Sequence, residues 1–477
     1  MRDGTNLAEH LLATASDDDL VLLSPGEGTH TYGDLRHAAA HLAARYTAEG
    51  LTGCRVGLEI SPTFGAVAAY LALLATDNTV VLARHADQPP WAGYLAEADV
   101  VTVVTNPEVD TSPPATTAPR LTFTRPTRPA VNLFTSGTTG RPKMVELSHD
   151  ALRHSCDAIL ERVKLRSDTR MALVLSLAHS FGLSVLNTHL RVGASLYCVE
   201  RVEFPGDVLR AFTEGGANAM AGVPTQLRTL TATVARSPER RLEVDTVLQA
   251  GGRLEPDDAQ ALAAVLPPDC GLYQMYGQTE AAARIAILPA DAYAKAPTSV
   301  GTPIDGLIVR ILDETGAEVP AGVDGEVVTR GTTIMDGYYG DPKATAAVLK
   351  DGWLHTGDIG HVDEDGYLYI SGRHSTFVKI DGERISLEAV EHAAMSSHPD
   401  TVADALAGAV KTDRGWSLTL DVRLADDASD DWRALQRSVK ESVRLKLGKK
   451  AAPAVVRQVD TIPYTHNGKK SRPNIVY

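Results

Sequence analysis

The chain has 477 residues, 44% of them hydrophobic, and this length exceeds what one hydrophobic core usually serves, so we expect two or more domains. Lys and Arg number 46 against 60 Asp and Glu, which gives a net charge of −14 (46 − 60). An acidic chain of this kind argues against nucleic acid or an anionic membrane as a partner.

The four cysteines are far apart and contain no Cys-x-x-Cys pair. They exclude an obvious zinc site and predict reduced, buried thiols in a cytoplasmic protein. The sequence opens without a signal peptide. Its longest apolar run, Phe64–Ala75, is too short to span a bilayer, so it predicts a buried helix.

Helix and strand patterns alternate from residue 31 to residue 82, which predicts an α/β domain with a parallel sheet flanked by helices. The sequence predicts a helix from Tyr32 to about Glu49, a strand at 55–60, a helix at 62–75 and a strand at 79–82. The Pro- and Thr-rich stretch 106–129 favours an extended linker.

Two apolar stretches, 130–134 and 144–147, predict the strands of a β-hairpin, and the loop between them is rich in glycine and hydroxyl groups. Glycines let the backbone approach a ligand closely, and successive N–H groups with Ser and Thr hydroxyls bind anions. The spacing is neither a Walker A loop nor Gly-x-Gly-x-x-Gly. The loop is therefore a candidate phosphate site, the alternative being an ordinary Gly/Thr turn. Its candidate ligands are Thr135, Ser136, Gly137, Thr138, Thr139 and Lys143.

Beyond the loop, the sequence predicts a helix at 150–163 capped by Ser148 or Asp150, an apolar strand at 171–177, and repeated strand–helix units through 202–300. From 301 to 370 short strands with Gly, Asp and Asn turns indicate a β-rich subdomain. Residues 373–477 are charged and of mixed α/β pattern. We place the boundary so that 1–372 form a large domain and 373–477 a small one.

Five segments, in this order along the chain, closely resemble motifs of the adenylate-forming superfamily, which includes acyl-CoA synthetases, aryl-acid ligases, stand-alone adenylation enzymes and luciferases. The segments are Thr135–Lys143, Tyr276–Glu280, His355–Asp358, Gly372-Arg373 and Pro463–Lys469. The resemblance implies a large AMP-binding domain, a small mobile C-terminal domain, and the use of ATP and Mg²⁺.

The resemblance assigns Lys469 to bridging the carboxylate and the α-phosphate during adenylation. An ammonium placed there offsets the repulsion between two anions; the alternative is a solvated surface lysine, which is what we expect of its neighbour Lys470. The resemblance further assigns Glu280 to the metal, Thr279 to the α-phosphate and Tyr276 to stacking on adenine, although Tyr276 could equally be a core residue. The remaining nucleotide contacts that it implies are Gly251, Gly252 and Arg253 for adenine, and Asp358 and Arg373 for ribose.

The acid pocket that the resemblance implies consists of Phe181, Gly182, Gly222, Gly252 and Gln278. Amino-acid-activating relatives carry Asp where this chain has Gly182, and a buried ammonium without a partner would be costly. We therefore expect an aryl or fatty acid and not a standard α-amino acid. His179 resembles the residue that lines the channel to the thiol, with a core histidine as the alternative.

The leading interpretation is an ATP- and Mg²⁺-dependent ligase that forms an acyl-adenylate and passes the acyl group to a thiol. Since no carrier sequence follows residue 474, we expect a separate acceptor: CoA or the phosphopantetheine of a carrier protein. Ser375 replaces the Asp or Lys usual at the hinge, which leaves open an atypical member that activates another oxyanion or passes the adenylate to an amine or an oxidant. A non-catalytic nucleotide-binding protein is the further alternative.

Overall fold

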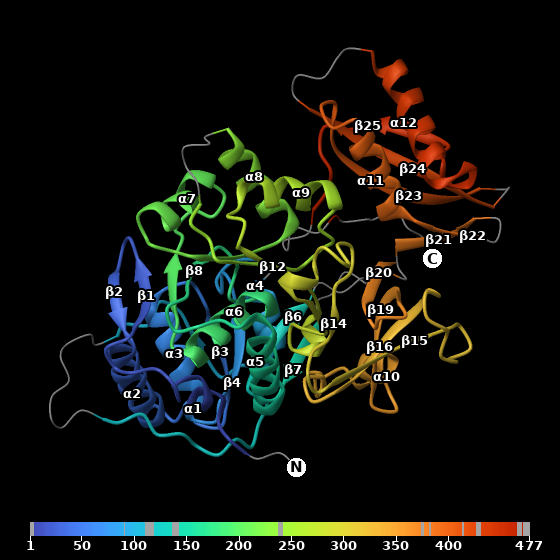
Figure 1. Cartoon of the computed structure of the whole chain (residues 1–477). Helices are drawn as coiled ribbons and strands as arrows, with labels where there is room; N and C mark the ends of the chain where they lie inside the picture. Colours follow the sequence, from blue (N-terminus) through green and yellow to red (C-terminus); the bar gives the residue numbers. More distant parts are fainter. Residues whose placement is uncertain are drawn as a thin grey trace.

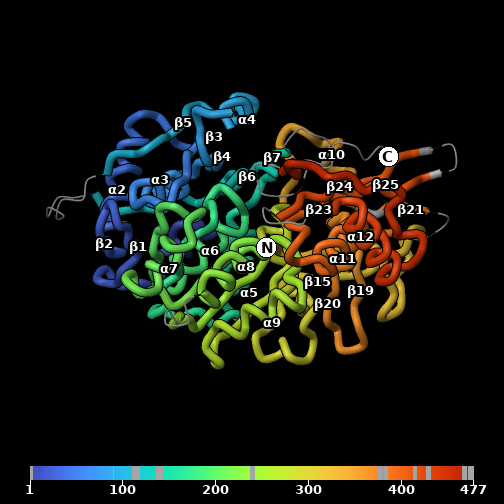
Figure 2. The backbone as a smooth tube through the Cα atoms, turned by 90° about the horizontal axis from the view of Figure 1, so that it is seen from above, coloured from blue at the N-terminus to red at the C-terminus, as the bar shows by residue number. Residues whose placement is uncertain are grey.

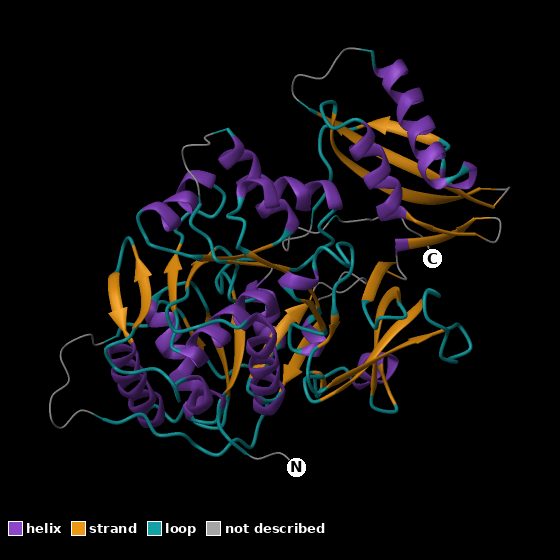
Figure 3. Ribbon diagram, viewed as in Figure 1, coloured by secondary structure: helices purple, strands orange, loops and turns teal. Residues whose placement is uncertain are grey.

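The computed structural model describes residues 4–89, 91–109, 119–135, 143–236, 242–373, 376–380, 383–412, 415–425, 431–464 and 470. Two large sheets and the helices between and around them make up the N-terminal part (Figures 1 and 3). This is the α/β arrangement that the alternating pattern predicted.

The six-stranded sheet has the order β17-β7-β6-β4-β3-β5. Strands β3, β4, β5 and β6 are parallel, whereas β6 and β7 form the expected antiparallel hairpin and β17 pairs antiparallel with β7. The strands are β3 (Arg55–Glu59), β4 (Thr79–Ala83), β5 (Val103–Val104), β6 (Val131–Thr135), β7 (Lys143–Leu147) and β17 (Gly337–Tyr338).

The nine-stranded sheet has the order β14-β13-β12-β11-β10-β8-β9-β1-β2 and is parallel from β12 to β1. Its strands are β1 (Leu20–Ser24), β2 (Gly28–Thr31), β8 (Arg170–Leu173), β9 (Ser195–Cys198), β10 (Ala219–Gly222), β11 (Thr246–Gln249), β12 (Gly271–Tyr276), β13 (Ala286–Leu288) and β14 (Thr302–Pro303). The expected strand 171–177 is wrong at its end, because β8 stops at Leu173 and residues 174–179 form the turn that leads into a helix.

The helices of this part begin where the sequence supplies a cap. Thr31 and Asp34 form a capping box at the start of α2, and Ser148, not Asp150, caps α5. Every residue of α3 is buried, as its apolar run predicted, and α3 contacts α1, α2, β3 and β4. The helices are α1 (Leu7–Leu11), α2 (Tyr32–Ala48), α3 (Phe64–Ala75), α4 (Trp91–Glu97), α5 (His149–Val163), α6 (Ser180–Val192), α7 (Pro205–Thr213), α8 (Pro224–Ala235) and α9 (Pro256–Val265).

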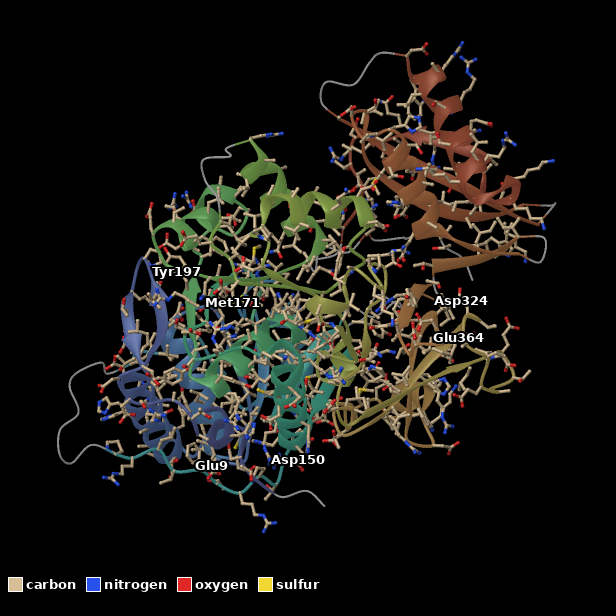
Figure 4. All side chains as sticks on the ribbon, in the orientation of Figure 1. Glu9, Asp150, Met171, Tyr197, Asp324 and Glu364 are labelled. Carbon is tan, nitrogen blue, oxygen red and sulfur yellow. The ribbon has the colours of Figure 1, made fainter. Side chains whose placement is uncertain are left out.

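A third, antiparallel sheet forms the β-rich region that the Gly/Asp/Asn turns predicted. Asp324 and Glu364 lie on the outside of this region (Figure 4), whereas Met171 of β8 is buried in the nine-stranded sheet region. Its elements are β15 (Leu307–Leu312), β16 (Gly325–Gly331), β18 (Leu349–Lys350), β19 (Trp353–Val362) and β20 (Leu368–Arg373), with α10 (Pro342–Val348) beside them. Since β20 runs through Arg373, the expected boundary after residue 372 falls inside this strand.

The C-terminal unit, from residue 376 on, has a hydrophobic core of its own, drawn from residues 378–456. It lies over the end of the β-rich region in both views (Figures 1 and 2). His392 Nε2 lies 3.6 Å from Glu255 Oε2 at the start of α9, which is one contact between this unit and the large part. The elements are β21 (Phe377–Ile380), β22 (Glu383–Ser386), α11 (Leu387–Ser397), β23 (Val402–Thr412), β24 (Gly415–Leu424), α12 (Trp432–Leu447) and β25 (Val455–Gln458).

None of the helices in the described part of the chain has the length and apolarity needed to cross a bilayer. All four cysteines are unpaired. Cys156 and Cys198 are buried as expected, but Cys54 and Cys270 are partly exposed, so the expectation of buried thiols was wrong for these two.

Two buried histidines make stability depend on pH. Burial lowers the pKa of both His149 and His189 to about 4. His149 Nδ1 accepts a hydrogen bond from the Leu7 N–H at 2.9 Å, which a protonated ring could not do. His189 Nδ1 donates to the Val185 carbonyl at 2.7 Å, which raises its pKa, but burial outweighs this bond. Between about pH 6.5 and pH 4 the unfolded chain takes up these protons and the folded chain does not, so the free energy of unfolding falls on acidification.

We expect His149→Gln, which keeps an acceptor for Leu7, to reduce that pH dependence by about one proton, or ~1.4 kcal/mol per pH unit. Urea unfolding measured at intervals from pH 7 to pH 4 checks this for the wild-type chain and the variant. An identical slope in the two proteins would contradict it.

Candidate active site

The hairpin β6–β7 holds both ends of the candidate phosphate loop. Thr135 pairs directly with Lys143, and the Thr135 hydroxyl donates to the Lys143 carbonyl at 3.4 Å. Ser136, Gly137, Thr138 and Thr139 lie outside the described residues. The sheet therefore fixes where the loop starts and ends.

Tyr338 of β17 connects this loop to Glu280. Its hydroxyl donates to Glu280 Oε1 at 2.8 Å, and Lys143 Nζ lies 4.7 Å from the centroid of its ring. Burial, reinforced by the negative charge of Glu280, raises the pKa of Tyr338, so the phenol stays a donor. The sequence interpretation missed Tyr338, since only the pairing of β17 with β7, nearly 200 residues apart in sequence, brings it here.

Tyr276, Asp358 and Arg373 form a second cluster at the end of β12. The Tyr276 hydroxyl donates to Asp358 Oδ2 at 2.5 Å, and Arg373 Nε lies 2.9 Å from Asp358 Oδ1. Asp358 and Arg373 are paired residues of β19 and β20, which explains why two distant motifs meet. Burial and then Asp358 raise the pKa of Tyr276, and Asp358 raises that of Arg373, so the cluster is one neutral phenol and one ion pair.

The glycines expected to contact adenine and the acid lie against one another. Ala250 N–H donates to the Gly222 carbonyl at 3.4 Å, and Gly251 has φ +84°, a backbone conformation that favours glycine. A Cβ on Gly251 would lie 2.9 Å from Val223 Cγ1. Arg253 is half exposed and its guanidinium lies 3.6 Å from Glu255, away from this contact.

The start of α6 lies beside the Thr279–Glu280 turn, because the Thr279 hydroxyl donates to Ser180 Oγ at 3.2 Å. His179 is the N-cap residue, with its ring 6.3 Å from that of Trp91. A Cβ on Gly182 would lie 2.2 Å from the Ser176 carbonyl oxygen, so the backbone leaves no room for any side chain there. Close packing against the Ser176 backbone is thus one explanation for glycine at position 182, and the substrate preference that we inferred from it is another.

The sequence interpretation also missed Arg284, which follows the same turn. Its side chain is 2% exposed, and its guanidinium carbon lies 4.3 Å from the centroid of the Phe181 ring. Gln278 opens the turn, and its amide Nε2 is buried without a partner among the described residues. The Gln278 amide therefore has a donor that no described residue uses, next to residues expected to line the acid pocket.

Lys469 and Ser375 lie outside the described residues, but the residues on either side of 465–469 are fixed. Lys470 Nζ lies 2.9 Å from Asp404 Oδ1 and 3.2 Å from Glu391 Oε2, both buried, and the Tyr464 hydroxyl donates to Asp404 Oδ2. Lys470 is thus not the solvated neighbour that the sequence suggested. It is an internal cation of the C-terminal unit.

One cavity of about 180 Å³ lies between α7 and α8. Its lining includes Val174, Met220 and Leu230 and contains none of the expected site residues. Within the described ranges no group of three or more His, Cys, Asp or Glu side chains could hold a metal ion. A metal at this site would therefore need oxygens from a ligand beside a single protein carboxylate.

Comparisons with known proteins place these residues in context. Residues 10–339 match the family described as AMP-binding enzyme. A feruloyl-CoA synthase from an Amycolatopsis species is 32% identical over 339 residues, which cover 71% of this chain and 67% of that protein. The amide bond synthetase McbA from Marinactinospora thermotolerans has a TM-score of 0.82 at 27% identity, covering 97% of both chains. ATP-bound MatB from Rhodopseudomonas palustris shares the fold, with a TM-score of 0.85 at 24% identity over 98% of this chain and 97% of that one.

Proposed function

The chain belongs to the AMP-binding enzyme family, and from that premise we propose which residues carry its ATP-dependent ligase reaction and which acid and acceptor it takes. The reaction has two steps. A carboxylate oxygen attacks the α-phosphorus of ATP and pyrophosphate leaves; a nucleophile then attacks the acyl carbon and AMP leaves.

The cluster of Tyr276, Asp358 and Arg373 is the observation that carries the assignment of the nucleotide site. Asp358 Oδ2 accepts from Tyr276 and Oδ1 forms an ion pair with Arg373, and each carboxylate oxygen has a further lone pair with which to accept from a ribose hydroxyl. The face of Tyr276 would support adenine near Gly251 and Gly252. Arg373 holds the carboxylate in place, with its Nε 2.9 Å from Asp358 Oδ1.

The phosphates would lie between Lys143, Thr279 and the loop 136–142. Bound Mg²⁺ supplies charge neutralisation on the phosphate oxygens, and Glu280 is the residue that would hold it. The donor set fits, because only Oε1 of Glu280 is engaged, by Tyr338, and Oε2 has no partner among the described residues. Lys469 would deliver the ammonium that offsets repulsion between the attacking carboxylate and the α-phosphate.

For the acid we propose an aryl or fatty acid and not an α-amino acid. Phe181 and Met275 are apolar side chains that both contact Arg284, shortly after the Thr279–Glu280 turn. No carboxylate faces them that could pair with an α-ammonium group among the described residues, since Glu280 is hydrogen-bonded to Tyr338 and Asp358 to Arg373. A charged ammonium would therefore remain buried and unpaired.

For the acceptor we propose a thiol, that of CoA or of the phosphopantetheine on a separate carrier protein, in line with the similarity to feruloyl-CoA synthase. We propose that residues 373–477, which include the C-terminal unit, reorient between the two steps. An amine is the second candidate, favoured by the similarity to the amide bond synthetase McbA over 97% of both chains.

Pyrophosphate exchange into ATP tests the first step across a panel of acids. We expect exchange with aryl or fatty acids and none with α-amino acids. Incubation of the productive acid with CoA, with a phosphopantetheinylated carrier and with a simple amine then separates the acceptors by mass. Exchange only with amino acids would contradict the acid assignment, and no exchange with any acid would favour another oxyanion substrate or a protein that binds nucleotide without turnover.

A further inference from the structure

Arg284 is a buried cation without an anionic partner. Its Nε lies 3.0 Å from Met275 Sδ and its Nη1 donates to the Ala283 carbonyl at 2.8 Å. No Asp or Glu pairs with it among the residues that the structure describes. A guanidinium has five N–H donors, so most of its hydrogen-bonding capacity is unused.

The surroundings of Arg284 offer little compensation for its charge. The Phe181 ring at 4.3 Å contributes a cation–π contact, and Met275 is 3% exposed. Burial lowers the pKa of Arg284 to about 9, which reflects the loss of hydration at this position. Buried charges in proteins are paired or bind ligands, since an unpaired one is costly.

The backbone before Arg284 is strained in a way that fixes where the side chain emerges. Ala282 and Ala283 have φ of +45° and +83°, which L-residues rarely adopt. Ser155 Oγ donates to the Ala282 carbonyl at 2.6 Å, and a Cβ on Gly277 would lie 2.0 Å from the Ala283 carbonyl oxygen. Such strain persists only where neighbouring contacts hold it, and it concentrates at binding sites.

The acid pocket provides the place where a partner would reach this cation. Arg284 lies over the ring of Phe181, the second residue of α6. Ser180, the first residue of α6, is hydrogen-bonded to Thr279 of the turn expected to hold the α-phosphate. Gln278, at the other end of the turn, contributes a second unpaired donor in its buried Nε2. If the acid substrate lies between α6 and this turn, its reacting carboxylate is near Thr279. The Arg284 guanidinium and the Gln278 amide would then be free to bind a second anionic group of the same substrate.

We propose that Arg284 binds a second anionic group of the acid substrate, so that the substrate class is a dianionic acid such as a dicarboxylate. One carboxylate is adenylated, and the other pairs with the guanidinium. This inference rests on the proposed function, because it assumes that the pocket beside Phe181 receives the acid. In apolar surroundings a charge-assisted, two-pronged pair is strong and discriminates sharply against an uncharged analogue.

Calorimetric binding of matched acids tests the inference without requiring turnover. Terephthalate and adipate, each beside its monoamide, are titrated into the full chain, and pyrophosphate exchange is measured with the same four compounds. For at least one pair we expect the diacid to bind about tenfold or more tightly than the monoamide. Arg284→Met should abolish that preference, and Arg284→Lys should retain part of it because the charge remains.

Arg310→Met is the matched control, since Arg310 is an exposed arginine of β15 and should leave the preference unchanged. Melting curves establish that each variant is folded. Three results would each overturn the inference. They are equal affinity for diacid and monoamide in both pairs, no binding of either diacid, and a preference for the diacid that survives Arg284→Met. Diacid binding that depends on Arg284 but supports no exchange would instead overturn the proposed function and leave only the assignment of Arg284 as a residue that binds an anion.

Discussion

Lys469→Ala is expected to slow pyrophosphate exchange by a factor of about 100 or more while ATP still binds, because the variant loses the cation proposed to offset charge in the transition state. The expected loss falls mainly on the rate of the chemical step, since the other residues that we propose for ATP binding belong to the large N-terminal part. Exchange kinetics at saturating ATP, with calorimetric ATP binding alongside, measure the two effects separately.

Two lysines make this experiment specific. Lys449→Ala removes an exposed lysine of the C-terminal unit and should leave exchange unchanged. Lys470→Met removes the internal cation that lies between Glu391 and Asp404, so it should lower the melting temperature of the C-terminal unit. If Lys469→Ala retained full exchange and folded Lys470→Met lost it, the role in adenylation would belong to Lys470 and not to Lys469.

Asp358→Asn is expected to weaken both ATP binding and the fold. The side chain of Asp358 is 4% exposed and that of Arg373 is 43% exposed, so water can replace part of the lost ion pair. We expect a loss of ~2–3 kcal/mol in the free energy of unfolding, below the full cost of breaking a fully buried pair. ATP affinity should fall about tenfold or more, because an amide cannot accept in place of both carboxylate oxygens.

Urea unfolding and calorimetric ATP titration measure these two quantities. Asp324→Asn is the matched control, since Asp324 is a half-exposed carboxylate of the same β-rich region that accepts from Ser371 and lies 2.8 Å from His361 Nδ1. It should change neither quantity by a comparable amount. Unaltered ATP affinity in folded Asp358→Asn would remove Asp358 from the proposed nucleotide site.

The sequence predicted well those elements whose signals are local. The apolar run 64–75 is long enough to require burial, and the hairpin around the loop is set by two short apolar stretches of strand length. The end of β8 was misjudged because Val174 and Leu177 are buried in a turn, and apolar composition alone does not separate a buried turn from a strand.

The motifs pointed to residues that the fold brings together, but they gave no sign of residues that join the cluster only through strand pairing. Asp358, Arg373 and Tyr276 come from separate motifs and lie in one cluster. Tyr338 and Arg284 belong to no motif that we recognised, because each acts through contacts with distant strands or helices. Gly182 is a residue that the sequence over-interpreted. We read its lack of an Asp side chain as a substrate preference, but its close contact with the Ser176 backbone requires glycine whatever the substrate is.

The edge strand β17 has a consequence for how the chain is made. Gly337 and Tyr338 complete a sheet whose other strands all lie before residue 148, so that sheet cannot close until the ribosome has produced more than two thirds of the polypeptide. Until then β7 is an unpaired edge, of the kind that recruits foreign strands. Pairing over so long a separation is slow to form, so β7 stays an open edge through most of synthesis.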